Sequence, residues 1–125
     1  MQGYNAILVY DEAEEKLLFC YRMKDPYKGK YNFVGGKIEE NEDGTAAAYR
    51  ELYEETGITQ EDIELYHLMD MTYYSDQFYL EIYAGKLKNK VKLTAEKNPL
   101  CWMDKNENFF DADRFAGDGN IGHIV

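Results

Sequence analysis

The sequence predicts an α/β fold in which a mixed β-sheet is flanked by helices. Short runs of aliphatic and aromatic residues dominate the chain, one strong helical pattern lies in the middle, and a weaker one lies near the end. At 125 residues, the chain has the length of one domain that buries its own hydrophobic core. We therefore expect residues 1–125 to form a single domain that needs neither a disulfide nor a metal to hold it together.

Two paired strands are predicted at the start of the chain. Residues 5–10 and 16–22 are apolar runs separated by the acidic turn DEAEE. A polar loop over residues 23–32 follows, and residues 33–36 then lead the chain into an acidic segment.

The acidic segment contains the strongest predicted helix, which runs to about Thr56. Asp43 or Thr45 can cap its start, because a side-chain oxygen at this place accepts a hydrogen bond from a free backbone N–H. Gly57 is the predicted stop, since glycine readily adopts the left-handed conformation that ends many helices. One face is expected to pack on the sheet, and its residues are Thr45, Ala46, Tyr49, Leu52 and Tyr53.

A hairpin is predicted after the helix. Residues 63–74 and 78–87 alternate in polarity and carry many aromatic side chains, and residues 75–77 make the tight turn between them. A polar connection over residues 91–99 leads to a short strand over residues 100–104. The last predicted element is a short helix over 107–115, ended by the glycine-rich segment AGDGNIG.

The charge balance limits the kinds of partner that the chain would bind. The formal net charge is -10 and the isoelectric point is about 4.6. Proteins that bind nucleic acid usually present a basic face, so we expect no nucleic-acid partner. A soluble acidic surface explains most of the charge, which also agrees with a site where a cation lies between the protein and an anionic small molecule.

The cysteines and the apolar runs indicate a compartment. Cys20 and Cys101 show no CxxC spacing, so two free thiols in a reducing environment are expected. No apolar stretch approaches the roughly 20 residues that span a membrane, and the N-terminus shows no export signal. We predict a cytoplasmic protein with no membrane contact. His67 and His123 show no metal-ligand spacing, and the sequence assigns neither a role.

Glu51, Glu54 and Glu55 lie on one face of the predicted helix. Like charges at this spacing destabilise a helix by about 0.2 to 0.5 kcal/mol per pair, so an uncompensated cluster is costly. A hard divalent cation would turn that cost into a binding site.

Residues 36–58 resemble the Nudix box, and every position that the family pattern specifies is matched. The matching residues are Gly36, Glu42, Arg50, Glu51, Leu52, Glu54, Glu55, Gly57 and Ile58. The resemblance implies a Nudix-type α/β/α sandwich with a central mixed β-sheet. The family's last helix is usually longer than this chain has room for, so either the C-terminus is truncated or a partner subunit in a homodimer supplies the missing cover.

The resemblance also implies the metal ligands. Glu54 and Glu55 would ligate Mg²⁺ or Mn²⁺, and Glu51 would ligate metal or accept a proton from water, which makes all of them catalytic candidates. The Gly36 carbonyl would complete the site. Glu96, in the loop before Pro99, is the candidate for an extra ligand or base, although a solvated loop acid is the alternative.

Arg50 and Glu42 would form an ion pair that supports the site without touching substrate, as the resemblance implies. Lys37 lies at the Gly-Gly turn, where its ammonium could reach a phosphate, and a free surface lysine is the alternative.

Residues 31–37, YNFVGGK, resemble a stretch of the Nudix enzymes that remove oxidised purine nucleoside triphosphates. In that subgroup the asparagine contacts the purine, so Asn32 is a candidate for base recognition. By looser matches Asp118 would read the purine edge and Phe115 would stack on the base. The alternative is that Asn32 supports a turn and Phe115 fills the core.

The implied activity is Mg²⁺-dependent hydrolysis of a nucleoside triphosphate to nucleoside monophosphate and pyrophosphate, with 8-oxo-dGTP as the named candidate. ADP-ribose, a nucleotide sugar and a dinucleoside polyphosphate are alternatives within the same chemistry. A Nudix module that senses a nucleotide without catalysis is an alternative of another class. Silent modules usually lose box glutamates, and this chain retains them.

Overall fold

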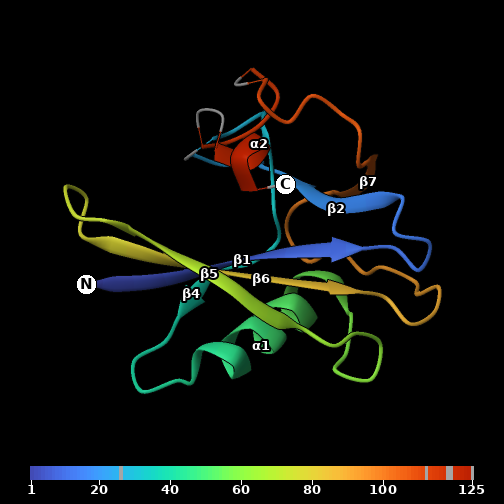
Figure 1. Cartoon of the computed structure of the whole chain (residues 1–125), viewed down its shortest axis with the longest axis horizontal. Helices are drawn as coiled ribbons and strands as arrows, with labels where there is room; N and C mark the ends of the chain where they lie inside the picture. Colours follow the sequence, from blue (N-terminus) through green and yellow to red (C-terminus); the bar gives the residue numbers. More distant parts are fainter. Residues whose placement is uncertain (26, 112, 118–119, 125) are drawn as a thin grey trace.

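The computed structural model describes residues 1–25, 27–111, 113–117 and 120–124 (Figure 1). Its strands are β1 (Gln2–Tyr10), β2 (Lys16–Tyr21), β3 (Tyr31–Asn32), β4 (Lys37–Ile38), β5 (Tyr66–Tyr73), β6 (Phe78–Lys86) and β7 (Leu100–Asp104). The helices are α1 (Gly44–Thr56) and α2 (Asn120–Ile124). None of the described helices has the length and apolar character needed to cross a bilayer.

All of these strands belong to one mixed sheet. The strand order is β3-β2-β1-β6-β5, with β4 paired to β1 and β7 paired to β2. Strand β1 runs parallel to β6, while the other named pairs are antiparallel. The uninterrupted apolar run of β1 suits this central position, because a strand covered on both faces has no solvent side.

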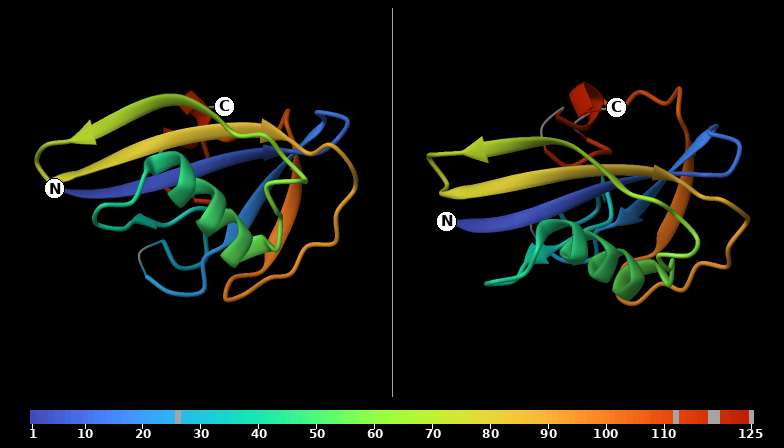
Figure 2. Two further views of the ribbon diagram at one scale, coloured as in Figure 1. Left: turned by 90° about the horizontal axis from the view of Figure 1, so that it is seen from below. Right: turned by 60° about the horizontal axis from the view of Figure 1, so that its bottom comes forward.

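Helices cover both faces of the sheet, as the sequence predicts. Helix α1 lies against one face, and α2 with the C-terminal segment lies against the other (Figure 1, Figure 2). Along β1, Ile7 and Val9 join the core under α1, whereas Ala6 and Leu8 join the core on the opposite face. The α/β/α class is therefore confirmed.

Helix α1 has the predicted ends. Asp43 is the cap, and its Oδ2 accepts a 3.1 Å hydrogen bond from the Ala46 N–H. Gly57 ends the helix in the left-handed conformation, with φ of 79°. The predicted packing face is wrong in part, because Thr45, Ala46 and Tyr53 are exposed. The buried residues are Ala47, Ala48, Leu52 and Thr56.

The observed packing face of α1 differs from the predicted one because the glutamates lie closer to the sheet than expected. Glu51 and Glu55 are half-buried at the edge of the packed face instead of pointing directly away from it. The apolar face is therefore rotated toward Ala48 and Leu52, and Tyr53 is 58% exposed.

The hairpin and the last strand agree with prediction, with β5 and β6 antiparallel and a turn between Tyr73 and Phe78. Strand β7 spans the predicted residues. The sequence gives no sign of β3 or β4, because a strand of two residues is too short to show a period.

The predicted helix over residues 107–115 is wrong. The described part of this segment forms turns, in which Asn108 Oδ1 accepts from the Phe110 N–H and Asp111 Oδ1 accepts from the Asp113 N–H. Such local side-chain bonds compete with helical ones. The helix forms later, as α2, in the segment where the sequence indicates a glycine-rich end.

Candidate functional site

The site is built where the Gly35–Gly36 turn passes between β1 and α1. The Asn5 N–H donates to the Gly36 carbonyl at 2.8 Å, and the Gly36 N–H donates to Asn5 Oδ1 at 2.9 Å. Gly35 has a φ of 144°, and a β-carbon there would overlap the Asn5 carbonyl. Only glycine fits so close to β1, and this close fit brings the turn beside the carboxylates of α1.

Gly36 leaves room for the Glu51 side chain. A β-carbon at Gly36 would lie 2.5 Å from the Glu51 carboxyl carbon. The Gly36 carbonyl, expected to complete a metal site, already accepts one hydrogen bond from β1. A carbonyl oxygen has two lone pairs, so one lone pair is left.

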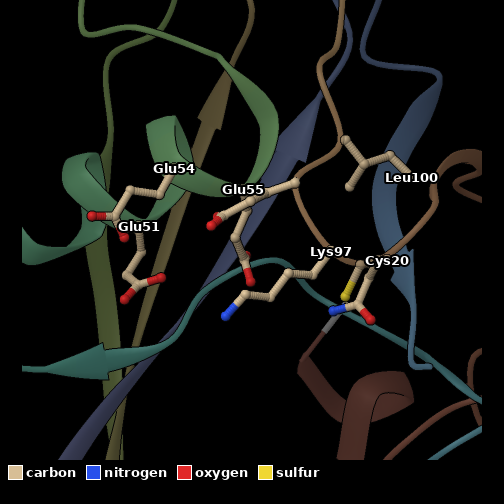
Figure 3. Close-up of a pocket in the computed structure, with 8 residues that line it drawn as sticks. Cys20, Glu51, Glu54, Glu55, Lys97 and Leu100 are labelled. Atoms are coloured by element: carbon tan, nitrogen blue, oxygen red, sulfur yellow. The ribbon is translucent and has the colours of Figure 1, made fainter. Parts of the chain in front are cut away.

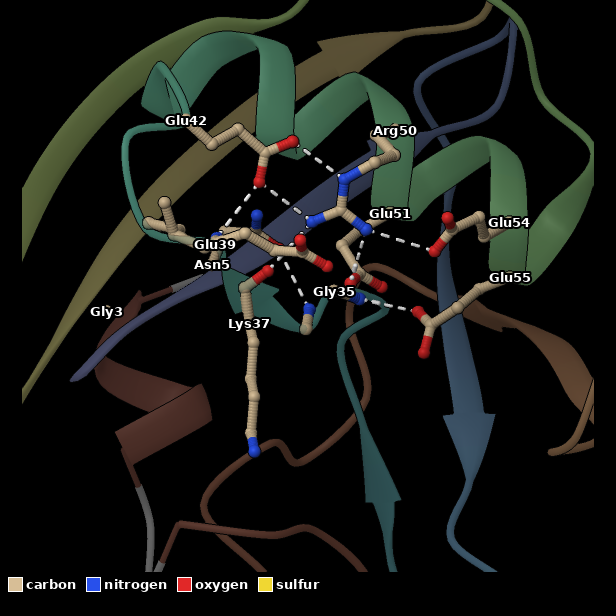
Figure 4. Close-up of polar contacts among 12 residues, drawn as sticks. Gly3, Asn5, Gly35, Lys37, Glu39, Glu42, Arg50, Glu51, Glu54 and Glu55 are labelled. Carbon is tan, nitrogen blue, oxygen red and sulfur yellow. Dashed lines mark hydrogen bonds and ion pairs between the residues drawn. The ribbon is translucent and has the colours of Figure 1, made fainter.

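Arg50 ties the turn, the acidic loop and the helix together (Figure 4). Its Nε and Nη2 donate to the Glu42 carboxylate at 2.7 and 2.9 Å, which is a bidentate ion pair. Nη2 also donates to the Lys37 carbonyl at 3.0 Å, and Nη1 donates to Glu51 at 3.0 Å and to Glu54 at 3.1 Å. The hydrogen bonds from Arg50 lower the pKa of Glu42 to about 2.

Glu55 is the most buried of the helix carboxylates that face the turn. Burial raises its pKa to about 7, against the opposing effect of a 2.7 Å hydrogen bond from the Gly35 N–H to Oε2. The negative charges of Glu51 and Glu96 raise the pKa further. Burial also raises the pKa of Glu51, although the hydrogen bond from Arg50 opposes this shift. Glu54 is less buried, with a side chain that is 49% exposed.

These glutamates line a cavity of about 170 Å³ together with the loop before β7 (Figure 3). Its lining residues are Cys20, Glu51, Glu54, Glu55, Glu96, Lys97, Asn98 and Leu100. Carboxylates that are gathered and partly dehydrated carry an electrostatic cost that a hard cation removes, and carboxylate oxygen is the donor that Mg²⁺ and Mn²⁺ prefer. The donor set fits such an ion.

The loop before β7 is held over the cavity at both ends. The Thr94 N–H donates to the Thr56 carbonyl at 2.8 Å, and Asn98 Oδ1 accepts from the Met23 N–H at 3.1 Å. These bonds bring Glu96 and Lys97 to the carboxylates of α1. Sequence reasoning missed Lys97 as a residue of this site. Its position directly after Glu96, the candidate ligand in this loop, could have indicated it.

The Gly35–Gly36 turn lines a second cavity, of about 850 Å³. Asn32, Lys37 and Gly36 line it. Glu55 and Cys20 line both cavities, so the two spaces meet at these residues. Sequence reasoning missed its aromatic lining, Tyr4, Tyr27, Phe33, Tyr73 and Phe78. These side chains come from segments far apart in the chain, so only the fold brings them together.

The candidate substrate-binding residues lie in different surroundings. Asn32 lines the larger cavity, and its Oδ1 accepts a 2.9 Å hydrogen bond from the Phe33 N–H. Among the described residues the amide NH₂ has no hydrogen bond of its own, so it can act as a donor. The expectation that Phe115 stacks on a base is wrong in this structure, because Phe115 is 0% exposed. It packs against Phe19 and Phe109 in the core. Asp118 lies outside the described residues.

The fold and site define a class: an α/β/α domain in which a carboxylate cavity suited to a hard cation opens beside a larger cavity with aromatic walls. A family model described as the NUDIX domain matches residues 2–121. The chain therefore belongs to the NUDIX domain family.

One curated relative is an RNA pyrophosphohydrolase from Histophilus somni strain 2336, which is 37% identical over 68 residues. The match covers 53% of this chain and 34% of the relative, so it spans about a third of that relative's length.

Solved structures share the fold at lower identity. The binary complex of a C. elegans Ap4A hydrolase has a TM-score of 0.75 and 20% identity, and the match covers 97% of this chain and 93% of that chain. A Francisella tularensis bifunctional NMN adenylyltransferase/ADP ribose pyrophosphatase, complexed with AMP and a Mn ion, has a TM-score of 0.73 and 19% identity. That match covers 98% of this chain and 40% of the other.

Proposed function

We propose that this protein is a metal-dependent pyrophosphohydrolase that cuts a phosphoanhydride in a small nucleotide. The observation that carries this proposal is the meeting of two cavities at Glu55 and Cys20. One cavity is lined by carboxylates, and the other is large enough for a nucleoside and has aromatic walls.

Mg²⁺ or Mn²⁺ is the proposed cofactor. Glu51, Glu54, Glu55 and Glu96 would hold it, and the remaining lone pair of the Gly36 carbonyl would add a ligand. A bound divalent ion supplies positive charge that neutralises a diphosphate and activates water for attack at phosphorus. The Mn ion in the Francisella structure supports this choice of metal class.

The protein's own groups would position the reactants and move the proton. Arg50, held by Glu42, fixes the rotamers of Glu51 and Glu54, and the Gly35 N–H fixes Glu55. A carboxylate oxygen that the ion leaves free would accept the proton of the attacking water, and Glu51 and Glu55 are the candidates. No covalent step on the protein is required.

The larger cavity is the proposed place for the nucleoside. The Asn32 NH₂ would donate to an acceptor on the base, and the Lys37 ammonium would reach a phosphate. An oxidised purine nucleoside triphosphate such as 8-oxo-dGTP remains the named candidate. The names of the relatives concern RNA, Ap4A and ADP-ribose, which keeps dinucleoside polyphosphates, ADP-ribose and nucleotide sugars as alternatives. Cytoplasmic location and a homodimer stay proposals from the sequence.

A nucleotide panel tests the proposal. Pyrophosphate and phosphate release would be measured for nucleoside triphosphates, including 8-oxo-dGTP. Nucleotide products would be separated by chromatography for ADP-ribose, a nucleotide sugar and Ap4A, which release neither ion. Each substrate would be tested with Mg²⁺, with Mn²⁺ and with chelator. We expect metal-dependent turnover of at least one substrate, with pyrophosphate as a product for triphosphates. Tight nucleotide binding without any turnover would favour a non-catalytic sensing module instead.

A further inference from the structure

A second cluster of metal-ligand side chains lies on the β5–β6 hairpin, away from the carboxylate cavity. His67, Asp70 and Glu81 each place a ligand atom within 4.8 Å of the others. None of these residues lines either cavity described above.

A bulge in β5 makes this arrangement possible. Residues three apart in a regular strand point to opposite faces of the sheet. The register shifts between His67 and Met69, and this irregularity brings His67 and Asp70 to the same face. Their partners on β6 are Tyr83 and Glu81, which are two residues apart and therefore already share that face.

Packing holds two of the candidate ligands in place. The His67 ring stacks on the Tyr83 ring, with centroids 4.6 Å apart and an interplanar angle of 21°. The Tyr83 hydroxyl donates a 2.6 Å hydrogen bond to Glu81 Oε1. Glu81 also packs so closely on the first residue of α1 that a β-carbon at Gly44 would overlap its carboxylate. Such outer contacts orient metal ligands in known sites.

The charges in the cluster favour a cation. Asp70 and Glu81 are directly opposite one another across the two strands, where like charges destabilise a sheet. His67 Nε2 lies 2.6 Å from Asp70 Oδ1, and the imidazole is a cation only when it is protonated. A contact of this length needs a proton on Nε2, so a metal that binds this nitrogen would displace that proton and place its own positive charge between the two carboxylates.

We propose that His67, Asp70 and Glu81 bind a divalent ion of the Zn²⁺ class, with water completing its coordination. One imidazole nitrogen and two carboxylate oxygens suit Zn²⁺ better than Mg²⁺, which prefers oxygen ligands alone. Ligand bonds of about 2.0 to 2.2 Å require the side chains to separate slightly, and Asp70 is exposed and can move. The ion would tie the edge strand β5 to β6.

Zn²⁺ titration in excess Mg²⁺ tests the site, because Mg²⁺ would compete for the glutamate cavity, and the variants separate Zn²⁺ bound there from Zn²⁺ bound at His67. Binding would be measured by calorimetry for wild type, His67→Ala, Asp70→Asn and His123→Ala. The chain has 2 histidines, so His123→Ala is the matched control. We expect one Zn²⁺ to bind wild type and the control, at least about tenfold weaker binding in the other variants, and a Zn²⁺-dependent rise in melting temperature that His67→Ala lacks.

Imidazole ¹⁵N chemical shifts give a reading that does not depend on how the variants fold. Zn²⁺ should shift the Nε2 resonance of His67 in the wild-type protein and leave that of His123 in place. The proposal is overturned if the His67 resonance does not move at saturating Zn²⁺, or if His67→Ala, folded by circular dichroism, binds as tightly as wild type.

Discussion

The Gly35 N–H donates a 2.7 Å hydrogen bond to Glu55 Oε2, and so it joins the glycine turn to the helix that carries the carboxylates. This bond favours the ionised carboxylate, but burial favours the neutral one and prevails, so the pKa of Glu55 is about 7. A cation that binds here must therefore displace a proton at acidic pH.

Metal binding should release protons in a way that depends on Glu55. Below its pKa of about 7 the carboxyl is protonated, so binding of Mg²⁺ or Mn²⁺ should release close to one proton per ion. The release should fall toward zero as the pH rises past that value. Calorimetry in buffers of different ionisation enthalpy measures the number of protons released per bound ion. Glu55→Gln should abolish this pH-dependent part, and equal proton release in the variant would contradict the assignment.

The same carboxyl should make the metal-free protein less stable as the pH rises. A group whose pKa is raised on folding contributes stability below its unfolded value, here 4.5, and loses it as pH passes its folded value of about 7. The free energy of unfolding of wild type, relative to Glu55→Gln, should therefore fall across this window. Urea denaturation in chelator measures the difference, and a gap that is constant with pH would show that burial does not control Glu55.

Glu54→Gln should fold normally and lose metal-dependent turnover. The substitution removes one ligand charge from an exposed side chain, so packing is unaffected. A loss of about 3 kcal/mol in transition-state stabilisation corresponds to roughly a hundredfold fall in kcat/KM. Glu61→Gln, on an exposed residue outside both cavities, is the matched control. Activity near wild type in Glu54→Gln would rule out Glu54 as a metal ligand.

Glu42→Gln should destabilise the protein at neutral pH and have little effect in acid. Arg50 lowers the pKa of Glu42 from 4.5 to about 2, so this pair contributes stability above pH 4.5 and loses it as the pH falls through about 2. The gap in melting temperature between wild type and variant should close over that range. Glu40→Gln, at an exposed glutamate of the same loop, should show no such gap. An unchanged gap in acid would mean that the charge of Glu42 is irrelevant.

Asn32→Ala should weaken recognition of the nucleoside and spare the diphosphate site. Asn32 lines the larger cavity and would donate its NH₂ to the base, so KM for the preferred nucleotide should rise by about five- to tenfold, the value of one hydrogen bond of roughly 1 kcal/mol. Inhibition by Mg-imidodiphosphate should not change. Asn106→Ala is the control for the loss of an exposed amide. An equal loss for every substrate in the panel would instead indicate a structural role for Asn32.

Lys97→Ala should weaken binding of Mg-imidodiphosphate by about tenfold or less, because an ammonium in the carboxylate cavity attracts phosphate as a point charge. Lys97→Arg should retain part of the affinity. Lys92→Ala, on an exposed residue of the same loop, should behave as wild type. If Lys97→Ala binds the analogue normally, Lys97 does not contact phosphate.

Local chemistry in the sequence determined much of this protein. The caps at Asp43 and Gly57 place α1, and the spacing of Glu51, Glu54 and Glu55 puts the carboxylates on one side of it. Both follow from interactions between residues that are close in the chain, which a single sequence displays directly.

Only the tertiary structure decided how those groups are used. The helix faces the sheet through Ala48 and Leu52, so Glu55 is buried and titrates near neutrality. The sequence left Phe115 open between a base contact and the core, and packing against Phe19 and Phe109 places it in the core. Burial and long-range contact set these outcomes, and neither is visible in a periodic pattern along the chain.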